Sequence, residues 1–201
     1  MAKYLEVAAK GKRGLNWDGV RDEPYPGCMV YDMTKLPMRG VSDNTYDGVY
    51  SEHFIEHLTK EEGEDYLFEM LRIMKPGGII RTVWPSMDVV DWLRSSENLD
   101  DHPFVQHYYQ FYIVKEKFAP PGKEHLSMQE QVAEGLLWQK GEHKYLWYKK
   151  ELMDKLKELG YKMVKEYEYM ASGCSEFKNI DTPGMIRKLH SAVVELITHD
   201  N

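Results

Sequence analysis

Short apolar runs separated by polar turns dominate the first 85 residues of the chain. Such runs, bounded by polar residues or glycines, are typical of buried strands. They occupy residues 4–9, 14–18, 28–31, 46–50 and 79–84. The last two flank a segment in which Leu67, Met70, Leu71 and Met74 recur at helical spacing and predict one apolar helix face.

The ends of this predicted helix are marked in the sequence. Thr59 and Glu62 have the spacing of a capping box, in which a hydroxyl and a carboxylate satisfy free N–H groups reciprocally. The run Lys75-Pro76-Gly77-Gly78 predicts the stop. A second amphipathic helix is predicted from Tyr148 to Leu159, followed by strands at 161–170 and 191–198.

Residues 86–143 have a different pattern, rich in aromatic and histidine side chains and interrupted by Pro-Pro-Gly at 120–122. We interpret them as an insertion or lid with its own helices, within a single domain that spans residues 1–201. The aromatic stretch 102–112 is predicted to contact a substrate, to bury an extra helix, or to form a contact between two subunits of a homodimer.

Strands that alternate with helices predict an α/β fold with a mostly parallel sheet and helices on both faces. The first connection does not fit this pattern, because the residues between Ala9 and Leu15 are too few for a crossover helix. Either that crossover is trimmed to a loop, or one of the two strands is irregular.

Composition narrows the range of partners. The chain of 201 residues carries a formal charge of −7, which opposes broad nucleic-acid binding. Cys28 and Cys174 have no metal-type spacing and predict reduced thiols. No signal peptide or membrane-spanning run is recognised, so we expect a cytoplasmic protein without a membrane partner.

The residues from Val30 onward resemble a known family. The strings VYDMTKLP, DNTYDGVYSEHFIEHL and LFEMLRIMKPGGIIRTVWP, in this order and spacing, resemble class I methyltransferases that use S-adenosylmethionine, in particular their small-molecule and glycan-associated branch. HKYLWYKKELMDKLKELGYKMV resembles the family's penultimate helix and strand. The resemblance implies a Rossmann-like sheet of seven strands with an antiparallel last strand.

The resemblance also implies a cofactor site at the carboxyl ends of the first four strands. Glu6 would face the methionine end of the cofactor, Asp18 the ribose and Asp32 the adenine amino group. Carboxylates suit these groups because they only accept hydrogen bonds. The remaining residues that would line the site are Met33, Tyr50, Ser51 and Glu52.

The first loop departs from the family's pattern of acid-x-Gly-x-Gly-x-Gly. In the sequence Glu6-Val7-Ala8-Ala9-Lys10-Gly11, Ala8 stands at the first glycine position and Lys10 at or near another, while Gly11 is retained. Ala8 and Gly11 are still predicted to contact the cofactor. The departure leaves three alternatives: a distorted working site, a different ligand, or a domain that no longer catalyses.

His53 follows the fourth strand and is the candidate for a catalytic residue. The segment His53-Phe54-Ile55-Glu56-His57 also matches the H-x-x-E-H pattern of one metallopeptidase class. The strand before it favours the methyltransferase interpretation, which assigns no metal ligands and gives His57 a packing role.

The sequence therefore predicts methyl transfer from S-adenosylmethionine to a small-molecule or glycan-precursor acceptor. The first alternative is a degenerate methyltransferase-like domain that serves binding or interaction. The remote alternative is a zinc hydrolase that uses the His53–His57 segment.

Overall fold

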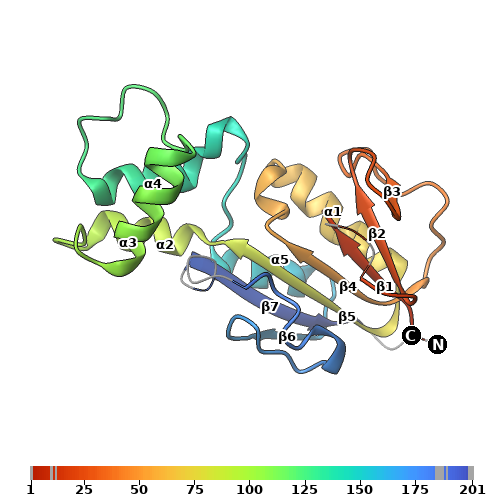
Figure 1. The fold of residues 1–201 in the computed structure, drawn as a ribbon. Helices are drawn as coiled ribbons and strands as arrows, with labels where there is room; N and C mark the ends of the chain where they lie inside the picture. Colours follow the sequence, from red (N-terminus) through yellow and green to blue (C-terminus); the bar gives the residue numbers. More distant parts are fainter. Residues whose placement is uncertain (1, 10, 12, 184–187, 189, 199–201) are drawn as a thin grey trace.

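The computed structural model describes residues 2–9, 11, 13–183, 188 and 190–198. Its centre is a sheet of seven strands in the order β3-β2-β1-β4-β5-β7-β6 (Figure 1). The strands are β1 (Tyr4–Val7), β2 (Trp17–Arg21), β3 (Cys28–Val30), β4 (Tyr46–Glu52), β5 (Met74–Pro85), β6 (Met163–Glu166) and β7 (Ser191–Ile197).

The first five strands are parallel, and β7 runs antiparallel to both of its neighbours, β5 and β6. This arrangement confirms the predicted Rossmann-like sheet with an antiparallel last strand. The first crossover is indeed trimmed: residues 8–16 join β1 to β2 without a helix in the described residues, and both strands are regular.

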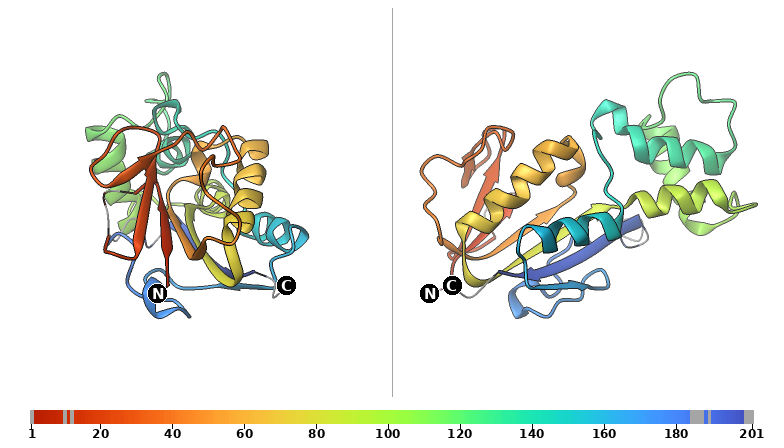
Figure 2. Two further views of the ribbon diagram at one scale, coloured as in Figure 1. Left: turned by 90° about the vertical axis from the view of Figure 1, so that its right-hand side faces the viewer. Right: turned by 180° about the vertical axis from the view of Figure 1, so that it is seen from behind.

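One face of the sheet is covered by α1 (Lys60–Ile73) and α5 (Lys149–Glu158), as the two views in Figure 2 show. The predicted capping box is present at the start of α1: Thr59 accepts from the Glu62 N–H, and Glu62 accepts from the Thr59 N–H. Leu67, Met70 and Leu156 are fully buried in the main core beneath these helices.

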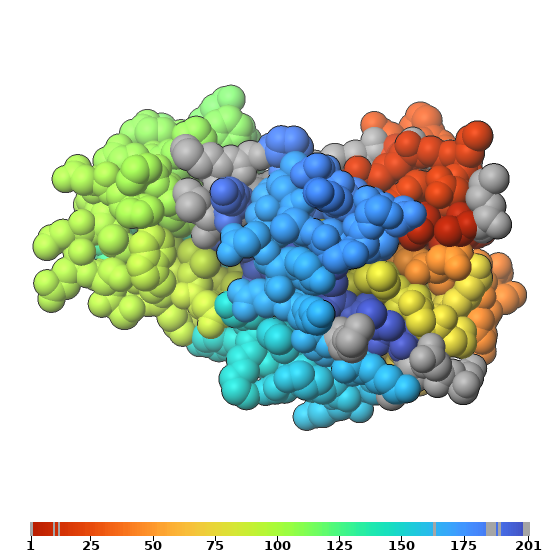
Figure 3. All heavy atoms as spheres, turned by 90° about the horizontal axis from the view of Figure 1, so that it is seen from below, coloured from red at the N-terminus to blue at the C-terminus, as the bar shows by residue number. Residues whose placement is uncertain are grey.

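The opposite face is covered by residues 167–182, which include the short turn η4 (Ser175–Phe177). Phe177 is fully buried there, in a cluster with Tyr4, Trp17 and Tyr50 from the sheet. Figure 3 shows this part of the chain lying across the middle of that face.

Residues 86–143 pack around a hydrophobic cluster of their own at one end of the sheet (Figure 1). Phe104, Tyr108 and Leu136 are among its buried members. Its elements are α2 (Met87–Ser95), α3 (Pro103–Tyr108), the π-helical segment η2 (Tyr109–Lys115), α4 (Met128–Trp138) and η3 (Gln139–Gly141). The presence of helices within residues 86–143 was therefore predicted correctly, whereas their status as an insertion or lid stays a prediction.

Three predicted boundaries were wrong. The second strand begins at Trp17 rather than ending at Asp18, because Leu15 is 97% exposed in the preceding turn. The residues Lys75 to Gly78 belong to β5 instead of forming a break before it. The sixth strand covers only Met163–Glu166.

Within the described residues, every helix is too short or too polar to span a bilayer.

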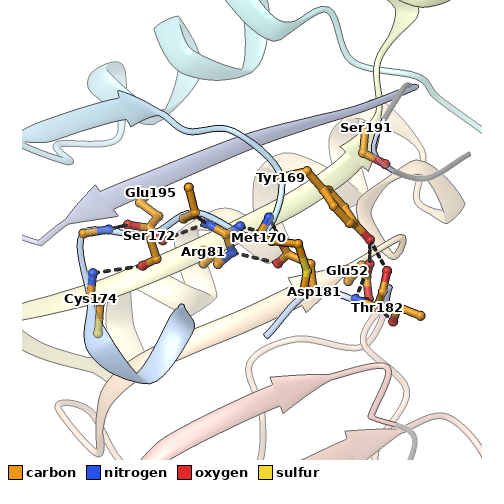
Figure 4. A network of polar contacts seen from close by, with 12 residues as sticks. Glu52, Arg81, Tyr169, Met170, Ser172, Cys174, Asp181, Thr182, Ser191 and Glu195 are labelled. Carbon is orange, nitrogen blue, oxygen red and sulfur yellow. Dashed lines mark hydrogen bonds and ion pairs between the residues drawn. The ribbon is translucent and has the colours of Figure 1, made fainter. Parts of the chain in front are cut away.

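A buried cation joins the sheet to the segment that covers its second face. Arg81 in β5 is fully buried and donates to Asp181 at 2.9 Å and to Glu195 at 2.7 Å (Figure 4). It also donates to the Ala171 carbonyl. Both carboxylates are themselves buried, so each depends on this guanidinium for charge compensation.

We expect Arg81→Met to lower the free energy of unfolding by about 3–5 kcal/mol, because it leaves two buried carboxylates without their counter-charge. Chemical denaturation measures this loss. Lys149→Met is the matched control: it removes an exposed ion pair with Glu166 and is expected to cost less than about 1 kcal/mol. Equal losses in the two variants would contradict the prediction.

Candidate functional site

A cavity of about 700 Å³ opens at the carboxyl ends of β1, β2 and β4. This is the edge at which open α/β sheets bind ligands. At this cavity the structure brings together three of the predicted cofactor-binding residues, Ala8, Asp32 and Met33, with the predicted catalytic residue His53. Other lining residues include Asp22, Glu23, Phe54, His57, Leu58 and Lys144.

Ala8 follows β1 directly and has φ = +57°, in the left-handed region that side chains with a Cβ rarely adopt. The backbone thus keeps a conformation that glycine adopts readily, although the residue is alanine. Gly11, the retained glycine, has φ = +127° but is not among the residues that line the cavity.

Glu6 lies in β1 and is buried, where both of its carboxylate oxygens accept from Arg13 at 2.7 and 2.8 Å. The Arg13 guanidinium also lies over the ring of Tyr50, 5.1 Å from its centroid. The acid that was predicted to face the methionine end of the cofactor is therefore paired with a cation from the altered loop itself, which the sequence reasoning missed.

Asp32 lies just after β3 and accepts hydrogen bonds from the Thr34 hydroxyl and backbone N–H, at 2.6 and 3.0 Å. With Lys35 2.9 Å away, these contacts lower the pKa of Asp32 to about 2, the Thr34 hydroxyl contributing most. The next residue, Met33, is buried and lines the same cavity. Asp32 is therefore a charged hydrogen-bond acceptor at neutral pH, and it is followed directly by the apolar side chain of Met33.

The predicted position of Asp18 was wrong. Since β2 extends to Arg21, Asp18 is only its second residue, where it pairs with Lys3 and accepts from the Tyr46 hydroxyl. The acids at the carboxyl end of β2 are Asp22 and Glu23, and both line the cavity. If the sequence analysis had placed the start of this strand at Trp17, the strand would have ended next to Asp22 and Glu23, and these acids would have been predicted as site residues.

Three further predicted residues, all in β4, do not line the cavity. Tyr50 is buried in the cluster on the second face, and burial raises the pKa of its hydroxyl strongly. Ser51 is fully buried beside Thr82. Glu52 accepts from the Tyr169 hydroxyl at 2.6 Å and from the Thr182 N–H, so its carboxylate is directed to the segment across the sheet (Figure 4).

His53 occupies the point where the sheet, the first cavity and the insertion meet. It has φ = +52°, and its N–H donates to the Val83 carbonyl of β5. Its Nε2 lies 2.9 Å from the Ser191 hydroxyl, and its Nδ1 lies 3.3 Å from Glu56. These contacts place an Nδ1–H toward the carboxylate and leave Nε2 as an acceptor, an assignment made from the contacts.

A second cavity of about 240 Å³ adjoins the first on the insertion side. The two share His53, His57 and Glu142 among their lining residues. The remainder of its wall is largely aromatic and comes mostly from the insertion, with Tyr108, Tyr112, Phe118, Leu136, His143 and His190.

Glu56 lies at the base of this region and is fully buried. Burial by itself raises the pKa of Glu56, but His53, His57 and His143 outweigh it and lower that pKa below its ordinary value. Burial also lowers the pKa of His143. The segment 53–57 is not one α-helix as the zinc-hydrolase pattern requires, because only Ile55–His57 are helical, as the 3-10 turn η1.

Comparison with known proteins gives a partial family match. Residues 5–82 match the family described as "Methyltransferase domain". Among curated proteins, none matches the sequence significantly.

Several solved structures share the fold. An S-adenosylmethionine-dependent methyltransferase from Archaeoglobus fulgidus superposes with a TM-score of 0.55 at 16% identity, over 98% of this chain and 86% of that protein. The CurJ carbon methyltransferase gives a TM-score of 0.52 at 14% identity, over 99% of this chain. This chain spans about half, 49%, of the CurJ protein's length. These likenesses confirm the class I methyltransferase fold that the sequence predicted.

The left-handed backbone at Ala8 predicts that Ala8→Gly stabilises the protein. Relief of about 1–2 kcal/mol of conformational strain exceeds the roughly 0.4–1 kcal/mol that glycine adds to the entropy of the unfolded chain. We expect a net gain of about 0.5–1 kcal/mol by chemical denaturation.

Ala9→Gly is the matched control for this measurement. Ala9 is fully buried and its φ is not positive, so we expect a loss of about 1 kcal/mol. A loss of stability in Ala8→Gly equal to that in the control would show that Ala8 is not strained.

Proposed function

We propose that this chain, which has the class I methyltransferase fold and matches the methyltransferase domain over residues 5–82, transfers a methyl group from S-adenosylmethionine to a small-molecule or sugar-like acceptor. The observation that carries the proposal is the cavity of about 700 Å³ at the strand ends, where acids after β2 and β3 stand beside Met33.

The nucleoside end of the cofactor is matched well by these side chains. Asp22 and Glu23 offer carboxylate acceptors suited to the two ribose hydroxyls, and Asp32 offers one for the adenine amino group. Val20, Met33 and Leu58 supply apolar surface along the same cavity, which suits the faces of a purine.

The part of the site that was predicted to face the methionine end of the cofactor is altered, mainly because Arg13 pairs with Glu6. A guanidinium bound to Glu6 removes the free acid that would attract an ammonium. The same guanidinium is a ready partner for a carboxylate, since its five N–H donors are not exhausted by two hydrogen bonds. Arg13 is not among the residues that line the cavity, but it lies in the loop that follows Ala8, and we propose it as a partner for the carboxylate of the methionine end.

The aromatic cavity beside His53 suits the acceptor. Its walls of Tyr108, Tyr112 and Phe118 favour a flat or partly apolar molecule, and its volume of about 240 Å³ restricts the bound part to a small group. Because the two cavities meet at His53 and His57, an acceptor there would lie next to the cofactor site.

When bound, S-adenosylmethionine supplies an electrophilic methyl group on a positively charged sulfur. The protein's contribution is to position the acceptor and to remove its proton. His53 is suited to the second task, because Glu56 orients its ring and stabilises the charge that a proton taken up at Nε2 would create.

A second candidate function is nucleoside binding without transfer. The pairing of Glu6 with Arg13, together with alanine at the first glycine position, favours it. It differs from the first candidate in a measurable way, because S-adenosylhomocysteine would bind while no labelled methyl group would leave S-adenosylmethionine.

We expect Asp32→Ala to weaken S-adenosylhomocysteine binding by about 10- to 150-fold, the loss of one charge-assisted hydrogen bond of about 1.5–3 kcal/mol. Isothermal titration calorimetry measures the dissociation constant. Asp18→Asn, at the acid outside the cavity, is the control and should bind as the wild type does. Absence of wild-type binding at millimolar ligand would refute the proposed cofactor.

We expect His53→Ala to lower the rate of methyl transfer by about 10²- to 10⁴-fold, because it removes the proton acceptor. The assay follows labelled methyl groups into a panel of small hydroxyl compounds. Binding of S-adenosylhomocysteine should change less than about threefold, since the cofactor's acids are intact. A variant with full transfer activity would exclude His53 as the base.

A further inference from the structure

Three potential metal ligands converge beneath the cavity that lies on the insertion side. Glu56, His57 and His143 each offer one ligand atom, and these atoms lie within 4.8 Å of one another. The rings of His57 and His143 meet edge to face with centroids 5.1 Å apart. Two imidazoles and one carboxylate form a donor set that zinc takes in catalytic sites, with a further position left open.

Backbone hydrogen bonds hold the two segments together. The Glu56 carbonyl accepts from the N–H of Lys144 at 2.9 Å and from that of Tyr145 at 3.3 Å. His143 directly precedes this pair, so the link between the chain segments fixes its position beside η1. The convergence therefore does not depend on long, freely rotating side chains.

Both histidines are oriented as metal ligands are. The Nδ1 of His143 lies 2.6 Å from the Leu136 carbonyl, and the Nδ1 of His57 lies 3.3 Å from the Glu142 carbonyl. An Nδ1–H that donates to a carbonyl leaves Nε2 with its lone pair, which is the usual outer-shell arrangement around a metal. The buried Nε2 of His143 has no hydrogen-bond partner among the described residues.

The surroundings of the Glu56 carboxylate give independent support for a bound cation. Its side chain is fully buried, and neither carboxylate oxygen receives a hydrogen bond from the described residues. The nearest ring nitrogen, the Nδ1 of His53, lies 3.3 Å from one of these oxygens, a contact without hydrogen-bond geometry. A buried carboxylate without donors is costly, and a bound cation would remove that cost.

We infer that Glu56, His57 and His143 bind a divalent first-row transition metal, for which Zn²⁺ is the best match. Zinc bonds of about 2.0–2.2 Å place neighbouring ligand atoms roughly 3.3 Å apart, so binding draws the three side chains inward. The site goes beyond the methyltransferase proposal and does not require it.

The position of the site indicates what the ion would do. His57 lines both cavities, and His143 lines the aromatic one. An open coordination position there would face the acceptor and lower the pKa of a bound hydroxyl group. This role, unlike the metal site itself, rests on the proposed function and favours an acceptor that reacts through oxygen.

Metal binding is tested directly on the full chain after dialysis against a chelator. We expect one equivalent of Zn²⁺ to bind, by calorimetry and by elemental analysis. Co²⁺ in the same site should give the strong visible absorption of a four-coordinate ion, and Zn²⁺ should abolish it. His57→Ala and His143→Ala are each expected to weaken Zn²⁺ binding at least 100-fold, and Glu56→Gln at least 10-fold.

His125→Ala is the control, since His125 is exposed in the loop before α4 and should leave Zn²⁺ binding unchanged. Unfolding of each variant in chelator establishes that its fold is intact. Absence of stoichiometric Zn²⁺ in the wild type, or unchanged binding in both histidine variants, overturns the site. If the variants fail to fold, the Co²⁺ spectrum of the wild-type protein decides: a weak absorption typical of a fully hydrated ion overturns the site. Titration of the metal-free protein with S-adenosylhomocysteine tests the proposed function separately.

Discussion

The buried guanidinium of Arg81 is the interaction on which the geometry of the candidate site depends. By pairing with Asp181 it holds residues 167–182 against the second face of the sheet. The same segment supplies Tyr169 and Thr182, which bind Glu52 at the end of β4. Figure 4 shows Arg81 and Glu52 in this network. The residue after Glu52 is His53, so a cation in the middle of the sheet helps to fix the strand end that precedes the candidate base. Displacing this segment would leave a buried charge without its partner, which is strongly unfavourable.

Short connections at the other edge of the sheet explain why the cavity is open. Loops alone, among the described residues, join β1 to β2, β2 to β3 and β3 to β4. The strand ends therefore lie near the surface, where carboxylates such as Asp22 are exposed to solvent. The insertion contributes the aromatic wall on the opposite side of His53, so a cavity with acidic residues and an aromatic one adjoin at His53, His57 and Glu142.

The parts of the fold that the sequence predicted well are those in which the signal is local. The capping box of α1 depends on residues three apart and was found as predicted. Of the predicted apolar face, Leu67 and Met70 are buried in α1, whereas Met74 begins β5. The start of β2 was wrong because the apolar Leu15 faces solvent, which a hydrophobic pattern cannot distinguish from a buried strand residue. His143 could not have been joined to Glu56 from the sequence, since their contact arises from backbone pairing between distant segments.

Backbone strain gives independent support for a ligand site at this edge. Ala8 and His53 both have positive φ angles, at the ends of the adjacent strands β1 and β4. Three of the other non-glycine residues with positive φ are asparagines, which tolerate this conformation in ordinary turns. Alanine does not share that tolerance, whereas histidine adopts this conformation more readily than most residues; both line the larger cavity. Strained residues cluster at functional sites, so the strained Ala8 at the end of β1 agrees with the ligand proposed for this cavity.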